Sequence, residues 1–221
     1  MNRTNREWIL ALVLLGLCTA ALHGQIRQGK FGVGLSGSGN ILNSDLPVNQ
    51  VGYGSSAALT YAVQDHWGFS SDIGFDMFLG KLSNGNEVSV PTFYGDLSFV
   101  YNIAPHRTFN PFIYVGGNLL TYYPREKTSA GYYDLLTGLN NVSWTVGIIG
   151  GFGFDYFLNE FWSVTASVQG GWLLSDNIDG IPLGGNDAFG RISIGVRYYL
   201  FDKSFVKELI ETSKELVKKK E

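Results

Sequence analysis

The most constraining feature of this sequence is a repeated alternation of bulky and small residues. In residues 67–80, WGFSSDIGFDMFLG, one alternate set carries Trp67, Phe69 and Ile73, and the other carries glycine, serine and the two aspartates Asp72 and Asp76. Successive side chains of a β-strand point to opposite faces. The segment therefore predicts a strand with one apolar face and one small, polar face.

The same alternation recurs along the chain and is interrupted by turn-forming residues. Short connections (64–66, 104–110 and 159–160) alternate with longer ones near 40–50, 81–91, 122–142 and 175–188. Short turns at one end and long loops at the other are typical of bacterial outer-membrane barrels. We therefore predict an all-β fold, an eight-stranded antiparallel up-and-down transmembrane β-barrel. Its strands are expected at residues 30–39, 53–63, 67–80, 92–103, 111–121, 143–157, 161–174 and 191–201.

A soluble ligand-binding barrel shares this strand count. The two interpretations, soluble barrel and transmembrane barrel, differ in which face points inward. The interior of an eight-stranded barrel is narrow, so it accepts the small set more easily than the bulky set. The bulky set on the outside would form an apolar belt that suits lipid and not water. Aromatic residues also gather at strand ends beside the short turns, as in a membrane-interface girdle. This girdle is predicted to contain Tyr61, Trp67, Tyr101, Tyr156, Trp162 and Tyr198.

The two ends of the chain differ from the barrel segment, which we place at residues 25–201. Residues 1–24 are expected to be a signal peptide, because Arg3 and Arg6 precede an apolar run. An uncleaved inner-membrane anchor and lipidation of Cys18, the single cysteine, are the alternatives. Residues 202–221 follow helical spacing and predict a short amphipathic periplasmic helix. The mild net charge of -3 argues against a nucleic-acid partner.

With these features the chain resembles the OmpA/OmpX-like family of small outer-membrane β-barrels over about residues 30–201. The last strand, SIGVRYYL, also looks like the assembly signal of such barrels. The resemblance implies contact with outer-membrane lipid and recognition by the barrel-assembly machinery through Ser193–Leu200. It also implies the outer membrane of a Gram-negative-type bacterium. Strand parity puts both termini in the periplasm.

By parity, six charged residues point into the lumen, and Arg197 is the candidate hub of an ion-pair network. Four carboxylates against two guanidinium groups leave two surplus negative charges, which a dry lumen could not hold unpaired. The network could be a structural plug or the lining of a narrow, cation-preferring channel. Inward-facing glycines, among them Gly68, Gly74 and Gly171, favour the channel. The six charged residues are Asp72, Asp76, Asp96, Asp155, Arg191 and Arg197.

No catalytic, cofactor-binding or metal-binding residues are predicted, and no cofactor is expected. His66 and His106 both fall on short turns, away from a serine nucleophile, and no residues have zinc-ligand spacing. The tyrosine-rich segment 122–142 suits a recognition surface, or else strands that extend beyond the bilayer. The sequence therefore predicts a non-enzymatic barrel with an envelope-structural or surface-interaction role and an unidentified surface partner. A narrow channel or small-solute conduit is the alternative.

Overall fold

The computed structural model describes residues 31–128, 131–135, 143–175, 178–180 and 186–200. The predicted signal peptide and C-terminal helix lie outside these residues. The described residues form strands β1 (Phe31–Asn43), β2 (Val48–Ala62), β3 (Trp67–Lys81), β4 (Glu87–Asn102), β5 (Phe109–Tyr122), β6 (Arg125–Thr128), β7 (Gly131–Asp134), β8 (Ser143–Phe157), β9 (Trp162–Leu173) and β10 (Ala188–Tyr199). None of the described residues belongs to a helix long and apolar enough to cross a membrane.

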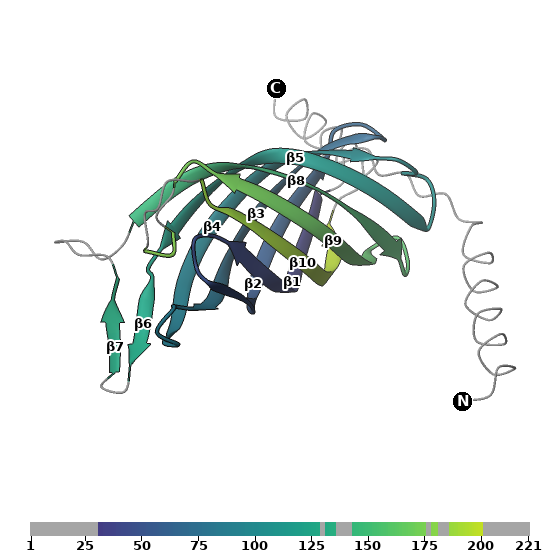
Figure 1. Ribbon diagram of the computed structural model, residues 1–221. Helices are drawn as coiled ribbons and strands as arrows, with labels where there is room; N and C mark the ends of the chain where they lie inside the picture. The colour runs from purple at the N-terminus through teal and green to yellow at the C-terminus, as the bar shows by residue number, and fades with distance from the viewer. Residues whose placement is uncertain (1–30, 129–130, 136–142, 176–177, 181–185, 201–221) are drawn as a thin grey trace, which may run out of the picture.

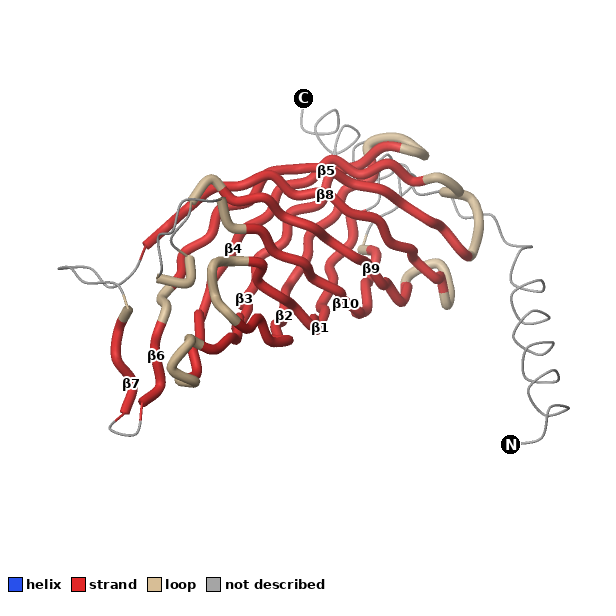
Figure 2. The backbone as a smooth tube through the Cα atoms, in the orientation of Figure 1, coloured by secondary structure: helices blue, strands red, loops and turns tan. Residues whose placement is uncertain are grey.

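Eight of these strands close into an antiparallel barrel (Figures 1 and 2). Around the wall the order is β1, β2, β3, β4, β5, β8, β9 and β10, and β10 pairs with β1 through Leu35 and Val196. The predicted eight-stranded barrel is confirmed, and all eight predicted segments are strands. The short strands β6 and β7 are additional, because β6 pairs with the first residues of β4 and β7 pairs with β6.

The connections are less asymmetric than the sequence suggests. One end of the barrel, here called the turn end, carries residues 63–66, 103–108 and 158–161. The opposite loop end carries the connections from β5 to β8 and from β9 to β10, but also the tight connections 44–47 and 82–86. The prediction of four long loops is therefore wrong for two of them. The residues expected in those loops continue the alternation and lengthen β1, β2 and β4.

The bulky residues of the alternating pattern lie on the outside of the barrel. Leu35, Ile73 and Trp144 expose 65%, 67% and 70% of their surface. The residues on either side of each one face inward and are less exposed. A belt of this kind around a water-soluble protein would exceed the apolar patches that monomers tolerate. In lipid the same belt is favourable, since barrels that span membranes turn an apolar band outward.

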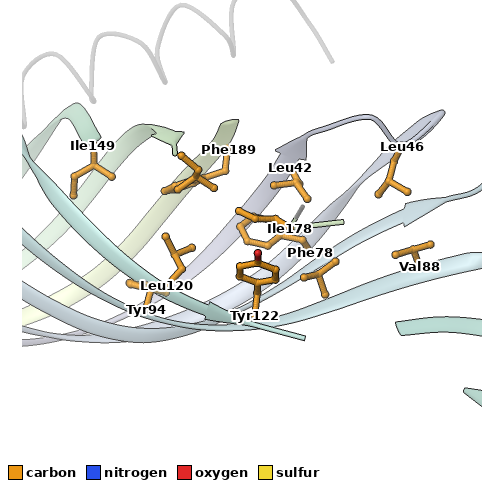
Figure 3. Packing of buried hydrophobic residues seen from close by; sticks show 12 residues of the cluster. Leu42, Leu46, Phe78, Val88, Tyr94, Leu120, Tyr122, Ile149, Ile178 and Phe189 are labelled. Carbon is orange, nitrogen blue, oxygen red and sulfur yellow. The ribbon is translucent and has the colours of Figure 1, made fainter. Parts of the chain in front are cut away.

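A buried apolar cluster fills the lumen at the loop end, where the sequence analysis expected small and polar side chains. Figure 3 shows its side chains pointing toward one another from facing strands, with Ile178 of the 174–187 connection among them. Leu42, Leu120 and Ile178 are fully buried. The inward residues of β1, β3, β4 and β5 thus change from polar to apolar near this end. The cluster consists of Leu42, Leu46, Phe78, Val88, Val90, Tyr94, Leu120, Tyr122, Ile149, Leu173, Ile178 and Phe189.

Two neighbouring leucines of β5 test this packing. Leu120 is buried in the apolar cluster, whereas Leu119 points outward and is half exposed. We expect Leu120→Ala to lower the free energy of unfolding by about 3–5 kcal/mol, because it leaves a cavity. Leu119→Ala should cost about 1–2 kcal/mol, because lipid fills the space that it vacates. Urea unfolding in phospholipid vesicles measures both, and equal costs would contradict the assignment of the two faces.

Candidate functional site

The centre of the lumen is organised by Arg191 of β10, which is 3% exposed. Its Nε and Nη2 both donate to Asp76 Oδ2 of β3, and its Nη1 donates to Asp96 Oδ2 of β4 at 3.2 Å. Strands β10 and β4 lie four positions apart in the ring of eight, so this contact crosses the lumen. A planar guanidinium fork is suited to hold two carboxylates at once.

Neutral polar groups add further hydrogen bonds to this cluster. Gln169 of β9 donates through Nε2 to Asp96 Oδ2 at 3.0 Å, and its Oε1 accepts from Arg191 Nη1 at 3.1 Å. Asn40 of β1 donates to Asp76 Oδ1 at 2.8 Å. Five strands thus contribute a side chain to one hydrogen-bonded cluster. We call Arg191, Asp76, Asp96, Gln169 and Asn40 the Arg191 cluster.

Aromatic rings and glycines from neighbouring strands shape the space around Arg191. Its guanidinium carbon lies 3.9 Å from the centroid of the Tyr94 ring, within the range of cation–π contacts. A Cβ on Gly74 would come within 2.5 Å of that ring, and a Cβ on Gly171 within 2.0 Å of Phe189. Of the inward glycines that favoured a channel, Gly74 and Gly171 are therefore covered by aromatic side chains, whereas a Cβ on Gly68 would meet the backbone of Tyr61. Gly151 beneath Tyr114 and Gly153 beneath Phe112 repeat this arrangement.

A second ion pair lies nearer the turn end. Arg197 of β10 donates through Nη1 to both carboxylate oxygens of Asp155 on β8, at 3.2 and 3.3 Å. The prediction that Arg197 is the hub is wrong, because Arg191 is the residue that contacts two aspartates. Parity alone could not choose between them, since both face inward and the choice depends on pairings across the lumen.

Asp72 of β3 also faces inward but takes no part in these ion pairs. It accepts a hydrogen bond from Ser70 Oγ at 2.8 Å. It lines a cavity of about 110 Å³ that lies between the Arg191 cluster and the Asp155–Arg197 pair and contains Asp96 in its wall. The cavity lining reaches Ala62 and Asn102, the last residues of β2 and β4 at the turn end.

All six residues of the predicted girdle lie on the outer face at the turn end, where several of their rings pack across strands. The ring centroids of Trp67 and Tyr101 are 4.5 Å apart, and those of Trp162 and Tyr198 are 4.8 Å apart. Phe31 and Phe109 were missed, although each is an aromatic residue at a strand end. With them, every barrel strand contributes one ring: Phe31, Tyr61, Trp67, Tyr101, Phe109, Tyr156, Trp162 and Tyr198.

Strands β6 and β7 form a ribbon that continues the sheet from the start of β4 and projects beyond the barrel wall (Figure 1). Lys127 Nζ donates to Glu87 Oε2 at 3.2 Å and ties the ribbon to β4. This hydrogen bond, and then the charge of Glu87, raise the pKa of the exposed Lys127 ammonium. Tyr132 and Tyr133 of β7 are 63% and 54% exposed. We call residues 125–134 the tyrosine hairpin.

His66 and His106 lie at the turn end, as expected from their short turns. His66 Nδ1 lies 2.7 Å from the backbone oxygen of Asn102, and His106 Nε2 lies 3.5 Å from Asp65 Oδ2. In the described part of the chain, no group of three or more His, Cys, Asp or Glu side chains could hold a metal ion.

Comparison with known families agrees with this architecture. Residues 9–199 match the model of the outer membrane protein beta-barrel domain, so the chain belongs to this family of outer-membrane barrel proteins. A search of curated protein sequences finds no match.

Several solved outer-membrane barrels share the fold at low sequence identity. OprG from Pseudomonas aeruginosa has a TM-score of 0.53 and 15% identity, with 80% of this chain and 99% of that chain covered. Neisserial surface protein A has a TM-score of 0.52 and 15% identity, covering 76% and 96%. Ail of Yersinia pestis, solved in complex with the heparin analogue sucrose octasulfate, has a TM-score of 0.51 and 11% identity, covering 78% and 99%.

Removal of Arg191 tests the energetic role of its cluster. We expect Arg191→Met to lower the free energy of unfolding by about 3–5 kcal/mol, because it leaves buried carboxylates without a cation. Arg191→Lys should recover only part of this, since an ammonium group is not a fork. Adding Asp76→Asn to Arg191→Met should restore part of the loss. Urea unfolding in vesicles measures the whole cycle, and a loss below about 1 kcal/mol, as at surface ion pairs, would contradict a structural role.

Proposed function

We propose that this protein is a non-enzymatic, non-conducting outer-membrane barrel that presents the tyrosine hairpin to a protein partner outside the cell. The observation that carries the proposal is the hairpin itself, which extends the barrel sheet and exposes Tyr132 and Tyr133. Exposed tyrosines are enriched at protein interfaces, where their rings offer a large contact area and a polar tip.

The packing of the lumen supports a closed barrel. The apolar cluster occupies the loop end, and beneath it the Arg191 cluster joins opposite walls. An ion that entered from the loop end would have to shed its water among leucine, valine and phenylalanine side chains, which costs several kcal/mol. The structural plug is therefore better supported than the channel.

A small-solute conduit is the second candidate, and one observation favours it. The cavity beside Asp72 reaches the turn end, so solutes could enter the lumen from that side. The same cavity is bounded toward the loop end by Tyr94, Ile149 and Arg191, which are buried. The conduit therefore needs a rearrangement of the apolar cluster.

The proposed orientation puts the turn end in the periplasm and the tyrosine hairpin at the cell surface. Short periplasmic turns and an aromatic girdle at the interface support it. Residues Phe31 and Leu200 lie together at the turn end, because Leu200 N donates to Phe31 O at 2.7 Å, so both ends of the barrel segment would face the periplasm. The segment Ser193–Leu200 lies in and just after β10, at the seam with β1, and its recognition by the barrel-assembly machinery remains part of the proposal.

Charge argues against one partner class suggested by a structural relative. Ail was solved with a sulfated heparin analogue. In the tyrosine hairpin of this chain, Arg125 and Lys127 are balanced by Glu126 and Asp134. A balanced ribbon offers no strong attraction to a sulfated ligand. A protein partner that packs against the tyrosines fits this surface better.

Cysteine labelling in intact cells tests the orientation. In a chain with Cys18→Ser, we expect Tyr132→Cys to react with a membrane-impermeant maleimide. Asp65→Cys, at the turn end, should react only after the outer membrane is permeabilised. The reverse pattern would contradict the proposed orientation.

Photo-crosslinking tests the proposed recognition surface. We expect benzoylphenylalanine in place of Tyr132 to give a discrete protein adduct on intact cells, because this side chain projects from the hairpin. The matched control carries the same residue in place of Phe93, which lies outward on β4 with 64% exposure. Gel analysis of both variants decides the matter. Equal adducts from both positions, or none from the hairpin, would count against the proposal.

A further inference from the structure

The pairing of charges in the lumen leaves negative charge uncompensated. Arg191 is held by Asp76 and Asp96, and Arg197 is held by Asp155. Within the described ranges, no cationic side chain lies at ion-pair distance from Asp72, whose hydrogen bond comes from Ser70. Four carboxylates and two guanidinium groups give a formal surplus of two negative charges.

Asp72, which has no ion pair among the described residues, faces Asp96, which shares Arg191 with Asp76. Asp72 of β3 and Asp96 of β4 are directly opposite in the antiparallel register. Such residues have Cβ atoms about 4.5–5.5 Å apart, and like charges at this separation repel each other. Both side chains line the same 110 Å³ cavity. A cation between the two carboxylates would relieve this repulsion.

One oxygen of Asp96 supplies a second observation. Its Oδ2 accepts from Arg191 Nη1 and Gln169 Nε2. Its Oδ1 is buried and has no hydrogen-bond partner in the structure, and the residue is only 4% exposed. A buried acceptor without a partner costs free energy, so this oxygen points to a ligand that the protein itself does not supply.

The cavity around these oxygens has the chemistry of a hard-cation site. Hydroxyl groups of Ser36, Ser56, Ser98 and Ser167 line it, and none of its lining residues is a cysteine or histidine. The guanidinium groups of Arg191 and Arg197 also line it, but each is already paired with aspartate carboxylates. Hard divalent cations prefer carboxylate, hydroxyl and water oxygens. A cavity of 110 Å³ holds several waters, which could complete a coordination shell.

We propose that this cavity binds one divalent metal cation of the Ca²⁺ type through Asp72 and through Oδ1 of Asp96. Its charge cancels the surplus of two, which water cannot do. Because the site has two carboxylates and not three or more, we expect weak binding, with a Kd on the order of 10⁻⁴–10⁻³ M. The lining that reaches Ala62 and Asn102 gives the cation a route from the turn end. This site is independent of the tyrosine hairpin.

Thermal unfolding of the refolded full-length chain tests the site, with CaCl2 as the probe against NaCl at equal ionic strength. Loss of heat-modifiable migration on gels gives the midpoint. We expect millimolar Ca²⁺ to raise the midpoint of the wild-type chain by several degrees, because a ligand that binds only the folded state stabilises it. Asp72→Asn should abolish this shift. Asp65→Asn, which removes an exposed carboxylate at the turn end, should retain it.

The remaining outcomes decide against the proposal. An equal unfolding midpoint of the wild-type chain in CaCl2 and in NaCl would mean that water or protons, and not a divalent cation, compensate the surplus charge. An equal shift in the wild type and in Asp72→Asn would place the cation elsewhere. If Asp72→Asn does not fold, Ser70→Ala replaces it, since loss of the hydroxyl that positions Asp72 should reduce the shift. An unchanged shift in Ser70→Ala would then overturn the assignment.

Discussion

Closure of the wall is the constraint on which the rest of this molecule depends. Lipid offers no hydrogen-bond partners, so each spanning strand needs a neighbour on both sides. The pairings of β1 with β10 and of β3 with β4 complete the ring, so that every barrel strand has a neighbour on both sides. Eight strands leave an interior only wide enough for side chains. The outer face must therefore be apolar, and the inner face must be filled by the side chains that remain.

The interior is filled by apolar side chains at one depth and by hydrogen-bonded charged and polar side chains at another. At the loop end, leucine, valine and phenylalanine side chains pack as they do in the core of a soluble protein. Deeper in the lumen, the Arg191 cluster links β10 to β3 and β4. It joins residues that are far apart in the sequence, such as Asp76 and Arg191. The apolar cluster above the Arg191 cluster is the basis for the proposal that this narrow barrel contains four aspartates without being a continuous pore.

The architecture was predictable because a period of two is a local property of the sequence. The segment 67–80 reveals its two faces without knowledge of its neighbours, and so do most of the other strands, although residues 111–121 carry bulky side chains on both faces. The Arg191 hub was not predictable in the same way, since Arg191 and Arg197 share a strand and a face. Their partners depend on which strands lie opposite, and this is set by closure of the ring.

The apolar cluster escaped the sequence analysis for a related reason. Val88 and Val90 lie in a segment that the sequence pattern predicted to be a loop, and Ile178 lies in a connection between strands. Alternation alone does not tell whether an apolar residue near a strand end faces lipid or lumen. The tyrosine hairpin was anticipated only in part, because the richness of residues 122–142 in tyrosine suited both a recognition loop and extended strands. The structure contains an extended ribbon with exposed tyrosines.

The central claim is that the apolar cluster and the Arg191 cluster close the lumen. Planar-bilayer recording of the refolded wild-type chain tests it most directly, with folded insertion verified by heat-modifiable migration. The closed barrel predicts a silent bilayer without stable conductance steps. Stable, cation-selective steps that weaken in Asp72→Asn would contradict it, because ions would then pass the level of Ile178 and Arg191.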